Sequence, residues 1–260
     1  MPDLRFYDIT ASTNDVVRSA VESLPDAAAV IAREQTAGRG RLGRRWLSPR
    51  GGLWMTMLFR AFSDPRTAQP VTIAAGLAIR RVLADCLPDN ARLKIKWPND
   101  IYYGDSKLAG ILIETTDETD GVALIIGIGI NVNNRVENNS IELAYPAASC
   151  AGIAQREFDI INLAGNVAGS LAETVSRFRL DPTLIASIDD YARASYGYGR
   201  NVRVSDAVFF NSETNAASDG IMKSDVLVGI ERGIDSAGRL LIDRYGQHLR
   251  VVSGSVRLVG

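Results

Sequence analysis

The sequence is poor in the residues that build many catalytic and metal sites: it has one histidine, His248, and two cysteines, Cys86 and Cys150, among 260 residues. A single histidine is a weak basis for a histidine-ligated metal site or a Ser-His-Asp triad, because nothing near it supplies the other partners. Two cysteines are too few for a disulfide framework, and they stand in no metal-ligand spacing. We therefore assign no direct protein ligand to a metal ion and expect His248 to be an ordinary strand residue.

An excess of one charge and a long apolar run are also missing. The formal net charge is −1, whereas proteins that bind nucleic acids or membrane surfaces generally carry a basic excess. No stretch reaches the roughly 18–20 apolar residues that a membrane span needs. The first ten residues carry charges and lack an apolar run, so they do not resemble a signal peptide. These absences predict a cytoplasmic protein without a membrane segment.

What the sequence does contain suits a soluble protein with a sizeable core, since 46% of its residues are hydrophobic and 23% are charged. Several apolar runs follow one another through short turns, which favours a mixed α+β sheet over a regularly alternating parallel one. Ser12, followed three residues later by Asp15, fits a capping box that opens the first helix. We predict strands over 4–9, 27–33, 52–59, 92–97, 101–103, 108–115 and 122–130, and helices over 12–23, 70–86, 159–178 and 182–196.

The pattern changes after about Gly199, where short β-like runs are separated by glycine-rich turns. These runs predict a small β-barrel, with a polar and mobile loop over 211–223. We therefore divide the chain into a catalytic domain, 1–198, and a C-terminal β domain, 199–260. The predicted strands of the second domain cover 201–204, 226–234, 239–243 and 249–258.

A glycine- and arginine-rich stretch over 38–46 carries the first chemical signal. Gly38, Gly40 and Gly43 match the spacing of a dinucleotide-binding loop, but a strand follows where that loop requires a helix. Glycines let a backbone approach a ligand, and arginine side chains match carboxylate and phosphate oxygens. Four arginines within seven residues therefore suggest an anionic ligand. The alternatives are a solvated basic loop or a contact with nucleic acid.

Two further stretches carry polar residues at the ends of apolar strands. Lys94 opens the run Lys94–Asp100, and a lysine at a strand end can stabilise charge on a phosphoryl group, although an ordinary strand-edge lysine looks the same. Small residues over 127–129 imply the close approach of a ligand or another backbone. Asn131 at the end of that strand suits a phosphate, a hydrated metal ion or a structural asparagine turn.

Taken in order, these stretches resemble the biotin protein ligase family. The resemblance rests on Ser12-Thr13-Asn14, on the run from Gln35 to Trp46, on Lys96–Asp100, on Lys107–Leu112 and on Gly129-Ile130-Asn131. It covers roughly residues 4–135, and the C-terminal β region agrees more loosely with the small SH3-like barrel of that family. Some members carry an N-terminal DNA-binding domain. The match here begins within the first few residues, so the resemblance implies a form without that domain and without operator binding.

The resemblance implies a role for each matched residue. Lys107 and Arg41 are the expected catalytic residues, since they would neutralise the biotin carboxylate and the α-phosphate. The expected biotin-binding residues are Ser12, Thr13, Asn14, Gln35, Gly38, Arg39, Gly40, Arg41, Lys107, Gly110 and Leu112. The expected ATP-binding residues are Arg41, Arg44, Trp46, Asn99, Lys107 and Asn131.

The implied activity is the ATP-dependent ligation of biotin to a protein lysine, with ATP, Mg²⁺ and biotin as cofactors and substrates. The implied partner is the biotin carboxyl carrier protein, or carrier domain, of a biotin-dependent carboxylase, and the enzyme would be a monomer or a homodimer. One alternative is a lipoate–protein ligase, which resembles this fold and uses the same adenylation chemistry. The other is a non-catalytic nucleic-acid-binding module that uses the arginine loop on phosphates.

Overall fold

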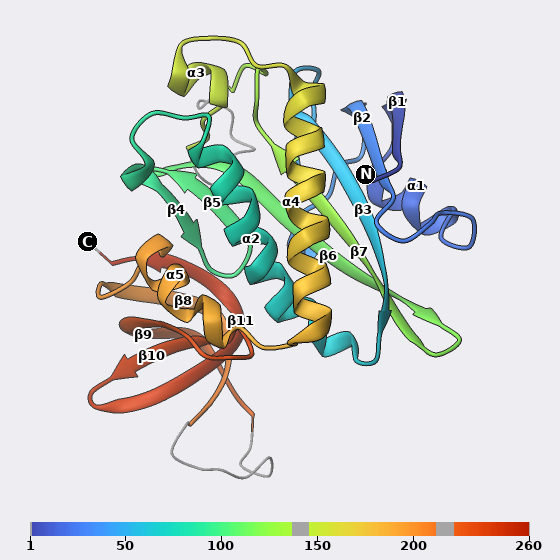
Figure 1. Ribbon diagram of the computed structural model, residues 1–260. Helices are drawn as coiled ribbons and strands as arrows, with labels where there is room; N and C mark the ends of the chain where they lie inside the picture. Colours follow the sequence, from blue (N-terminus) through green and yellow to red (C-terminus); the bar gives the residue numbers. More distant parts are fainter. Residues whose placement is uncertain (1, 137–145, 212–220, 260) are drawn as a thin grey trace.

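The computed structural model describes residues 2–136, 146–211 and 221–259. These residues form a seven-stranded sheet in the order β1-β2-β3-β7-β6-β5-β4, followed by a closed barrel of four strands in the order β10-β11-β8-β9 (Figure 1). In the sheet only β1 and β2 pair in parallel, and the other neighbours pair antiparallel. The predicted α+β architecture with a C-terminal barrel is confirmed.

The sheet strands lie close to their predicted positions. They are β1 (Leu4–Thr10), β2 (Ala29–Gln35), β3 (Leu53–Phe62), β4 (Leu93–Lys96), β5 (Asp100–Tyr103), β6 (Ser106–Glu118) and β7 (Gly121–Ile130). The helices are α1 (Thr13–Ser19), α2 (Ala68–Ala84), α3 (Cys150–Ala154), α4 (Ile160–Leu180) and α5 (Ile188–Ala194).

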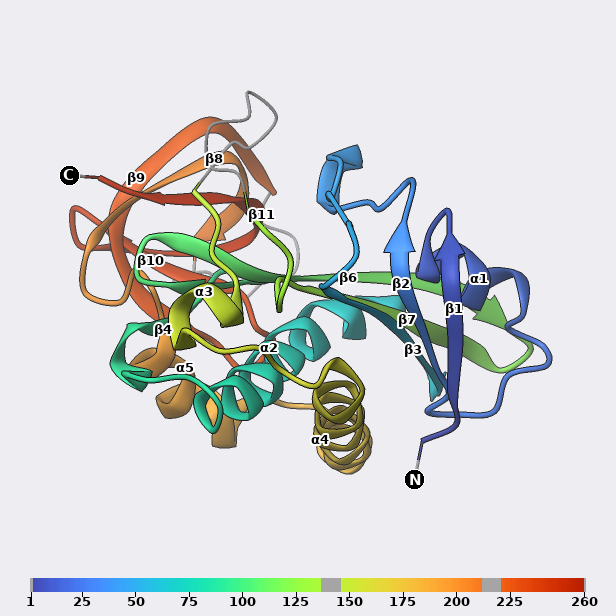
Figure 2. The ribbon, with the colours of Figure 1, turned by 90° about the horizontal axis from the view of Figure 1, so that it is seen from above.

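Alternation along the strands produces two cores, one on each face of the sheet. In β7, Leu124 and Ile126 belong to the large core, whereas Ala123 and Ile125 belong to a small one with Val17 of α1. Successive strand residues point to opposite faces, so α2 and α4 cover one face and α1 lies on the other (Figure 2). The face shared by Ala123 and Ile125 continues to Gly127, which packs against Asn14 in the first turn of α1, and to Gly129.

Two helix predictions need correction. The helix predicted over 182–196 begins only at Ile188, after a short 3-10 turn at Ile185–Ser187, and it ends at Ala194. The segment before it is held to the barrel, since the Leu184 N–H donates to the Ser236 carbonyl. The helix predicted over 12–23 ends at Ser19. Its first turn has Ser12 at the N-cap without a side-chain capping bond, so the predicted capping box does not form.

The barrel consists of β8 (Asn201–Asn211), β9 (Met222–Ile234), β10 (Leu240–Arg244) and β11 (Gln247–Leu258). The first strand is longer than predicted because it pairs with both β9 and β11. His248 lies in β11, as expected. Residues 212–220 of the predicted loop over 211–223 lie outside the described residues, whereas Met222 and Lys223 belong to β9.

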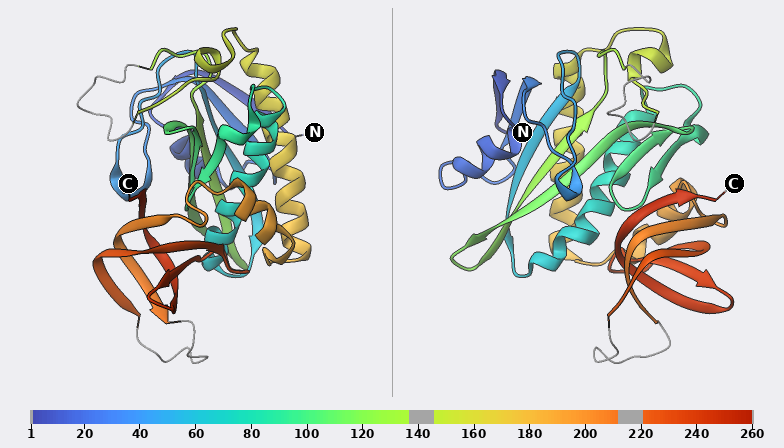
Figure 3. Two further views of the ribbon diagram at one scale, coloured as in Figure 1. Left: turned by 90° about the vertical axis from the view of Figure 1, so that its left-hand side faces the viewer. Right: turned by 180° about the vertical axis from the view of Figure 1, so that it is seen from behind.

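The barrel is fastened to the sheet through the turn between β9 and β10. The indole N–H of Trp97 donates to the Gly238 carbonyl over 3.0 Å in a buried contact, and Gln69 at the start of α2 reaches the same carbonyl. One continuous hydrophobic core joins the barrel to α2, α4 and α5. Figure 3 shows the barrel packed beside the β4 end of the sheet, next to the loop that follows β2.

Candidate active site

A pocket of about 850 Å³ opens on the sheet face opposite α2 and α4. Its wall comes from the start of α1, the loop between β2 and β3, the turn between β4 and β5, and the ends of β6 and β7. All but one of the predicted site residues line it: Ser12, Thr13, Asn14, Gln35, Arg39, Gly40, Arg41, Arg44, Trp46, Asn99, Lys107, Gly110, Leu112 and Asn131.

Gly38 is the exception, because it does not line the pocket. It is buried, and a Cβ at this position would lie 2.5 Å from the Trp46 carbonyl oxygen and 2.6 Å from the Ser48 hydroxyl. The Trp46 N–H donates to the Gly38 carbonyl over 2.9 Å. Gly38 therefore lets the two arms of the glycine-arginine loop pack closely.

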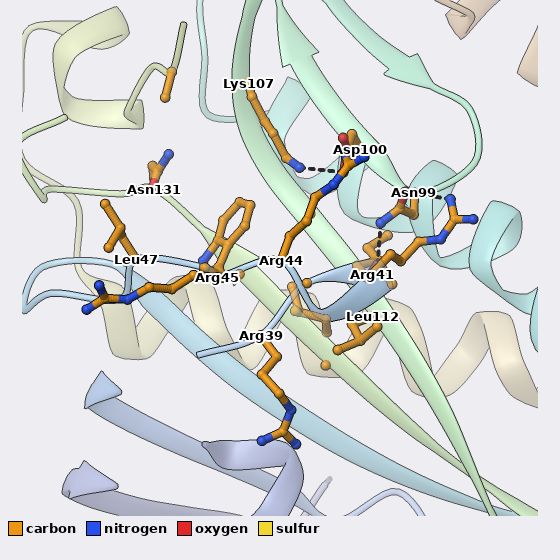
Figure 4. A pocket seen from close by; sticks show the side chains of 18 of the residues that line it. Arg39, Arg41, Arg44, Arg45, Leu47, Asn99, Asp100, Lys107, Leu112 and Asn131 are labelled. Atoms are coloured by element: carbon orange, nitrogen blue, oxygen red, sulfur yellow. Dashed lines mark hydrogen bonds and ion pairs between the residues drawn. The ribbon is translucent and has the colours of Figure 1, made fainter. Parts of the chain in front are cut away.

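The glycine-arginine loop, residues 38–46, is a small hairpin closed by a 3-10 turn at Arg41–Gly43. The Gly40 N–H donates to the Arg44 carbonyl over 2.7 Å, and Leu42 takes a left-handed conformation with φ 58°. No α-helix starts here, so the dinucleotide reading of the glycines is excluded. The turn presents Arg41 and Arg44 on the side of Lys107 and Asn99 (Figure 4).

Arg39 points away from these side chains and toward α1 (Figure 4). Its guanidinium donates to both carboxylate oxygens of Asp15, one of them over 2.7 Å. This hydrogen bond holds the pKa of Asp15 below its usual range. Asp15, predicted to cap α1, instead ties the glycine-arginine loop to that helix.

Glycines form the floor of the pocket. Gly110 of β6 pairs with Gly129 of β7, and the indole of Trp46 lies on both. A Cβ at Gly129 would lie 2.5 Å from Trp46 Nε1, and one at Gly110 would lie 3.1 Å from the ring. Absent side chains therefore make room for the indole, whose N–H has no hydrogen-bond partner among the described residues.

Uncharged polar groups line the pocket near Gly127. The backbone N–H of Thr13 donates to Gln35 Oε1 over 2.8 Å, and Gln35 Nε2 donates to Ser48 over the same distance. Thr56 Oγ1 lies 2.7 Å from both Thr13 Oγ1 and Asn14 Oδ1. Thr13, Asn14 and Thr56 are buried, so their hydrogen bonds form a rigid network.

Cationic groups line another part of the pocket. The Lys107 ammonium lies 2.7 Å from the Asp100 carboxylate and 4.9 Å from the centroid of the Trp46 ring. Arg41 donates to Asn99 Oδ1 over 3.4 Å, and burial lowers the pKa of Arg41. Burial also lowers the pKa of Lys96 from 10.5 to about 8. Unsolvated positive charge of this kind attracts a multivalent anion.

Asn131 is fixed at the end of β7. Asn134 Nδ2 donates to Asn131 Oδ1 over 3.1 Å, and Asn134 Oδ1 accepts from the Val132 N–H over 2.9 Å. Both side chains are buried and both line the pocket. The amide N–H groups of Asn131 are therefore held at the pocket wall. Asn131 thus belongs to a structural turn and also offers a polar group to a ligand.

Sequence reasoning did not assign several pocket residues. Lys96 and Asp100 stood inside a matched motif but without a role. Thr56, which contacts Thr13 and Asn14 without lining the pocket itself, lies in an apolar strand that carries no motif. Gly254–Val256 of strand β11, beside an irregularity in its pairing with β8, also line the pocket. No local pattern in the C-terminal region predicts that contact. Among the described residues, no group of three His, Cys, Asp or Glu side chains is placed to hold a metal ion, and no helix is long and apolar enough to cross a membrane.

Comparison with known proteins identifies the family. A profile of the Biotin/lipoate A/B protein ligase family matches residues 6–131. The biotin–[acetyl-CoA-carboxylase] ligase of Paracoccus denitrificans is 33% identical over 238 residues, which cover 90% of this chain and 91% of that protein. This chain belongs to the biotin protein ligase family. Another relative, the bifunctional ligase/repressor BirA of Escherichia coli, is 32% identical, with 90% of this chain and 67% of BirA covered.

A solved biotin protein ligase shares the whole architecture. The structure from Aquifex aeolicus in complex with biotin and ATP superposes with a TM-score of 0.78, at 24% identity, over 100% of this chain and 99% of that one. The shared fold therefore includes both the sheet and the C-terminal barrel.

Proposed function

We propose that the protein is an ATP-dependent biotin–protein ligase, which forms biotinyl-5'-AMP from biotin and ATP and then transfers biotin to a lysine of a carrier protein. One observation carries the proposal: a single pocket joins an uncharged hydrogen-bonding network to a cluster of cations. Along β7 the distance from Gly127, beside the network, to Asn131 is four residues, or about 13 Å in an extended strand. That length suits an uncharged ring, an aliphatic chain and a phosphate in line.

In the first step a carboxylate oxygen of biotin bonds to the α-phosphorus of ATP, and the bond from that phosphorus to pyrophosphate breaks. Two anions must approach each other, so fixed cations lower the barrier. Lys107 and Arg41 supply them in this proposal, as the sequence analysis expects. Arg44, Asn99 and Asn131 hold the nucleotide phosphates, and the indole of Trp46 offers its face to the adenine.

Mg²⁺ fits this pocket as an ion that arrives with the nucleotide. It prefers oxygen ligands and is commonly held by one or two carboxylates together with substrate phosphates. Asp100 is a carboxylate in the wall, and Asn131 is a polar neighbour. The ion supplies further charge neutralisation at the phosphates.

The mixed anhydride that results is prone to hydrolysis, so the loop must shelter it. Arg39 anchors one side of the glycine-arginine loop to α1, while Gly40 and Arg41 lie over the pocket. A closed loop excludes water from the anhydride. In the second step the amine of the acceptor lysine bonds to the carbonyl carbon, AMP leaves with its oxygen, and the amine loses a proton to solvent.

We propose a biotin carboxyl carrier protein, or carrier domain, of a biotin-dependent carboxylase as the acceptor. We also propose a cytoplasmic location, where ATP is available, without a membrane or DNA partner for these residues. We propose a monomer or a homodimer. The edge strand β1 exposes Phe6, Tyr7 and Ile9, and an exposed strand edge can pair with a second copy of the chain. We also propose that the domain boundary lies at 198/199, next to the start of β8 at Asn201.

The family profile spans biotin and lipoate ligases, but the relatives above are named as biotin ligases. The network at Thr13, Asn14 and Gln35 also favours biotin, because its hydrogen bonds need a ring with polar atoms. Family membership argues against the nucleic-acid-binding module.

Transfer to a carrier domain tests the proposal. The purified protein, biotin, ATP and Mg²⁺ are incubated with an apo carrier domain and with the same domain whose target lysine is arginine. The proposal predicts ATP-dependent biotinylation of the first and none of the second, measured by intact mass. Lipoylation without biotinylation when both acids are offered would contradict it.

A further inference from the structure

Glu114 in β6 touches the uncharged end of the pocket without lining it. Its Oε2 accepts a hydrogen bond from Asn14 Nδ2 over 2.7 Å and lies 3.3 Å from the guanidinium of Arg18. The Glu114 side chain is 27% exposed and does not belong to the pocket wall, whereas Asn14 does. The direct contact through which Glu114 can act on a ligand ring is therefore its hydrogen bond to Asn14, although its charge also acts on the guanidinium of Arg39.

The carboxylate decides which way the Asn14 amide faces. Carboxylate oxygens only accept hydrogen bonds, so Asn14 must turn its nitrogen to Glu114 and its oxygen to Thr56. The amide oxygen also only accepts, so the single hydroxyl proton of Thr56 goes to Asn14. Thr56 then offers Thr13 a lone pair across their 2.7 Å contact.

A second acceptor fixes the other end of the network. Ser48 Oγ lies 3.2 Å from the Trp46 carbonyl oxygen, which only accepts, so Ser48 donates there and accepts from Gln35 Nε2. Gln35 therefore turns its Oε1 toward Thr13, whose N–H donates to it. The Glu114 carboxylate and the Trp46 carbonyl together set the direction of the hydrogen bonds between them.

With these directions fixed, Asn14 and Gln35 each keep one amide hydrogen for a ligand, and Thr13 Oγ1 keeps a lone pair. A cyclic urea has a carbonyl that accepts and ring N–H groups that donate, whereas a dithiolane ring has neither. We propose that Glu114 is a positioning residue that fixes the Asn14 amide and thereby makes this end of the pocket selective for a cyclic urea. The inference rests on the proposed function, and it assigns the cyclic urea of biotin to the end of the pocket at Asn14.

Gly127 supports the same orientation. A Cβ at this position would collide with Asn14 Oδ1, so the missing side chain lets the Asn14 amide lie across β7 and reach Glu114. Arg18 also contacts the Thr115 carbonyl and stands on the outer side of Glu114. It contacts the carboxylate but not Asn14, which makes it a suitable control position.

The test is the binding of biotin to the whole protein without ATP, measured by calorimetry for the wild type, Glu114→Met, Glu114→Gln and Arg18→Met. Loss of one oriented hydrogen bond corresponds to a rise in Kd of about tenfold, which is expected for Glu114→Met. Glu114→Gln keeps an oxygen that can accept, so its Kd rises less. Arg18→Met keeps the carboxylate, so its Kd stays within about twofold of the wild type. The KM for ATP stays close to wild type in all three variants. The melting temperature falls modestly in Glu114→Met, which leaves the buried Asn14 nitrogen without its acceptor, and all three variants stay folded at the assay temperature.

A double-mutant cycle separates positioning from a general structural role. In an Asn14→Ala background, Glu114→Met should cause no further rise in the Kd for biotin. An equal rise in both backgrounds, or wild-type binding by Glu114→Met, overturns the inference and leaves the ligase proposal standing. A folded wild type that binds lipoate but not biotin overturns the ligase proposal itself, and the inference with it.

Discussion

Lys107 stands in the pocket with its charge already partnered. Its ammonium pairs with Asp100 over 2.7 Å and lies over the Trp46 ring. The ion pair with Asp100 sets the position of the Lys107 ammonium before the substrate arrives, so a phosphate that binds beside it meets a charge already in place. This preorganisation costs no rearrangement at the moment of reaction.

Replacing Lys107 with alanine should therefore disable adenylation without unfolding the protein. We expect the rate of biotin-dependent ATP–pyrophosphate exchange to fall by about 10²–10³-fold, the usual effect of removing one group that stabilises developing charge. The control is Lys94→Ala, whose ammonium binds the Arg193 carbonyl on the exterior. Equal exchange rates in Lys107→Ala and Lys94→Ala would contradict the catalytic role of Lys107.

The lowered pKa of Lys96 predicts that kcat/KM for ATP depends on pH. Burial lowers its pKa from 10.5 to about 8, so the ammonium is charged below pH 8 and neutral above it. A neutral amine attracts the triphosphate less, and kcat/KM for ATP, which reports the free enzyme, should fall as pH rises through about 8. In Lys96→Met this decline should disappear, and kcat/KM should be low at every pH. A decline that persists unchanged in the variant would assign the titration to another group.

Single residues also show where sequence reasoning reaches its limit. The resemblance located Lys107, Asn99 and Asn131 correctly in one pocket, because their motifs are local. It placed Gly38 in the binding set, although this glycine serves the packing of the loop. Thr56 and Glu114 could not be found, because their roles depend on Asn14, which lies far from both in the sequence.

Among the elements, the glycine-arginine loop has the clearest mechanical role. It is a hairpin whose turn carries Arg41 and whose side is tied to α1 through the Arg39–Asp15 pair. The sequence predicted the loop but not its contact with α1, because Asp15 was interpreted as part of a helix cap. Strands were predictable from alternation, whereas the end of α1 at Ser19 and the start of α5 at Ile188 follow no local signal in the sequence.

Arg41→Gly tests the loop as a cover. Without the guanidinium near Asn99, the closed loop loses a contact to the pocket and the adenylate escapes sooner. Because Arg41 also serves adenylation, less biotinyl-AMP forms in total. We expect a larger share of it in solution than with the wild type, and labelling of lysines on a bystander protein such as albumin. Chromatography of the reaction and intact mass of the bystander measure both. An unchanged released share of biotinyl-AMP and unlabelled albumin would contradict the role of Arg41 in covering the adenylate.

In the molecule as a whole, the barrel contributes to the pocket, and a buried acid joins it to the segment that follows α5. Glu231 of β9 is 1% exposed and accepts a hydrogen bond from Ser195, which follows α5. Burial raises its pKa from 4.5 to about 7. The sequence predicted the barrel from its short strands, but the contacts of Glu231 and of Gly254–Val256 depend on how the barrel docks.

The raised pKa of Glu231 makes the folded protein bind a proton more tightly than the unfolded chain. The wild type should therefore lose stability as pH rises from about 4.5 to 7, by up to about 3 kcal/mol over the whole window. Glu231→Gln cannot ionise, so this loss should be absent and the variant should exceed the wild type in stability at pH 8. Urea unfolding at pH 5 and pH 8 measures both. An equal pH dependence of stability in the wild type and Glu231→Gln would contradict the assignment of this loss to Glu231.

The central claim, that this pocket activates biotin with ATP, is tested most directly by ATP–pyrophosphate exchange with the purified protein and Mg²⁺. Three samples are compared: one with biotin, one with lipoate and one with neither acid. The account predicts exchange that requires biotin. Exchange with lipoate alone, or no exchange in a folded sample with either acid, would contradict it.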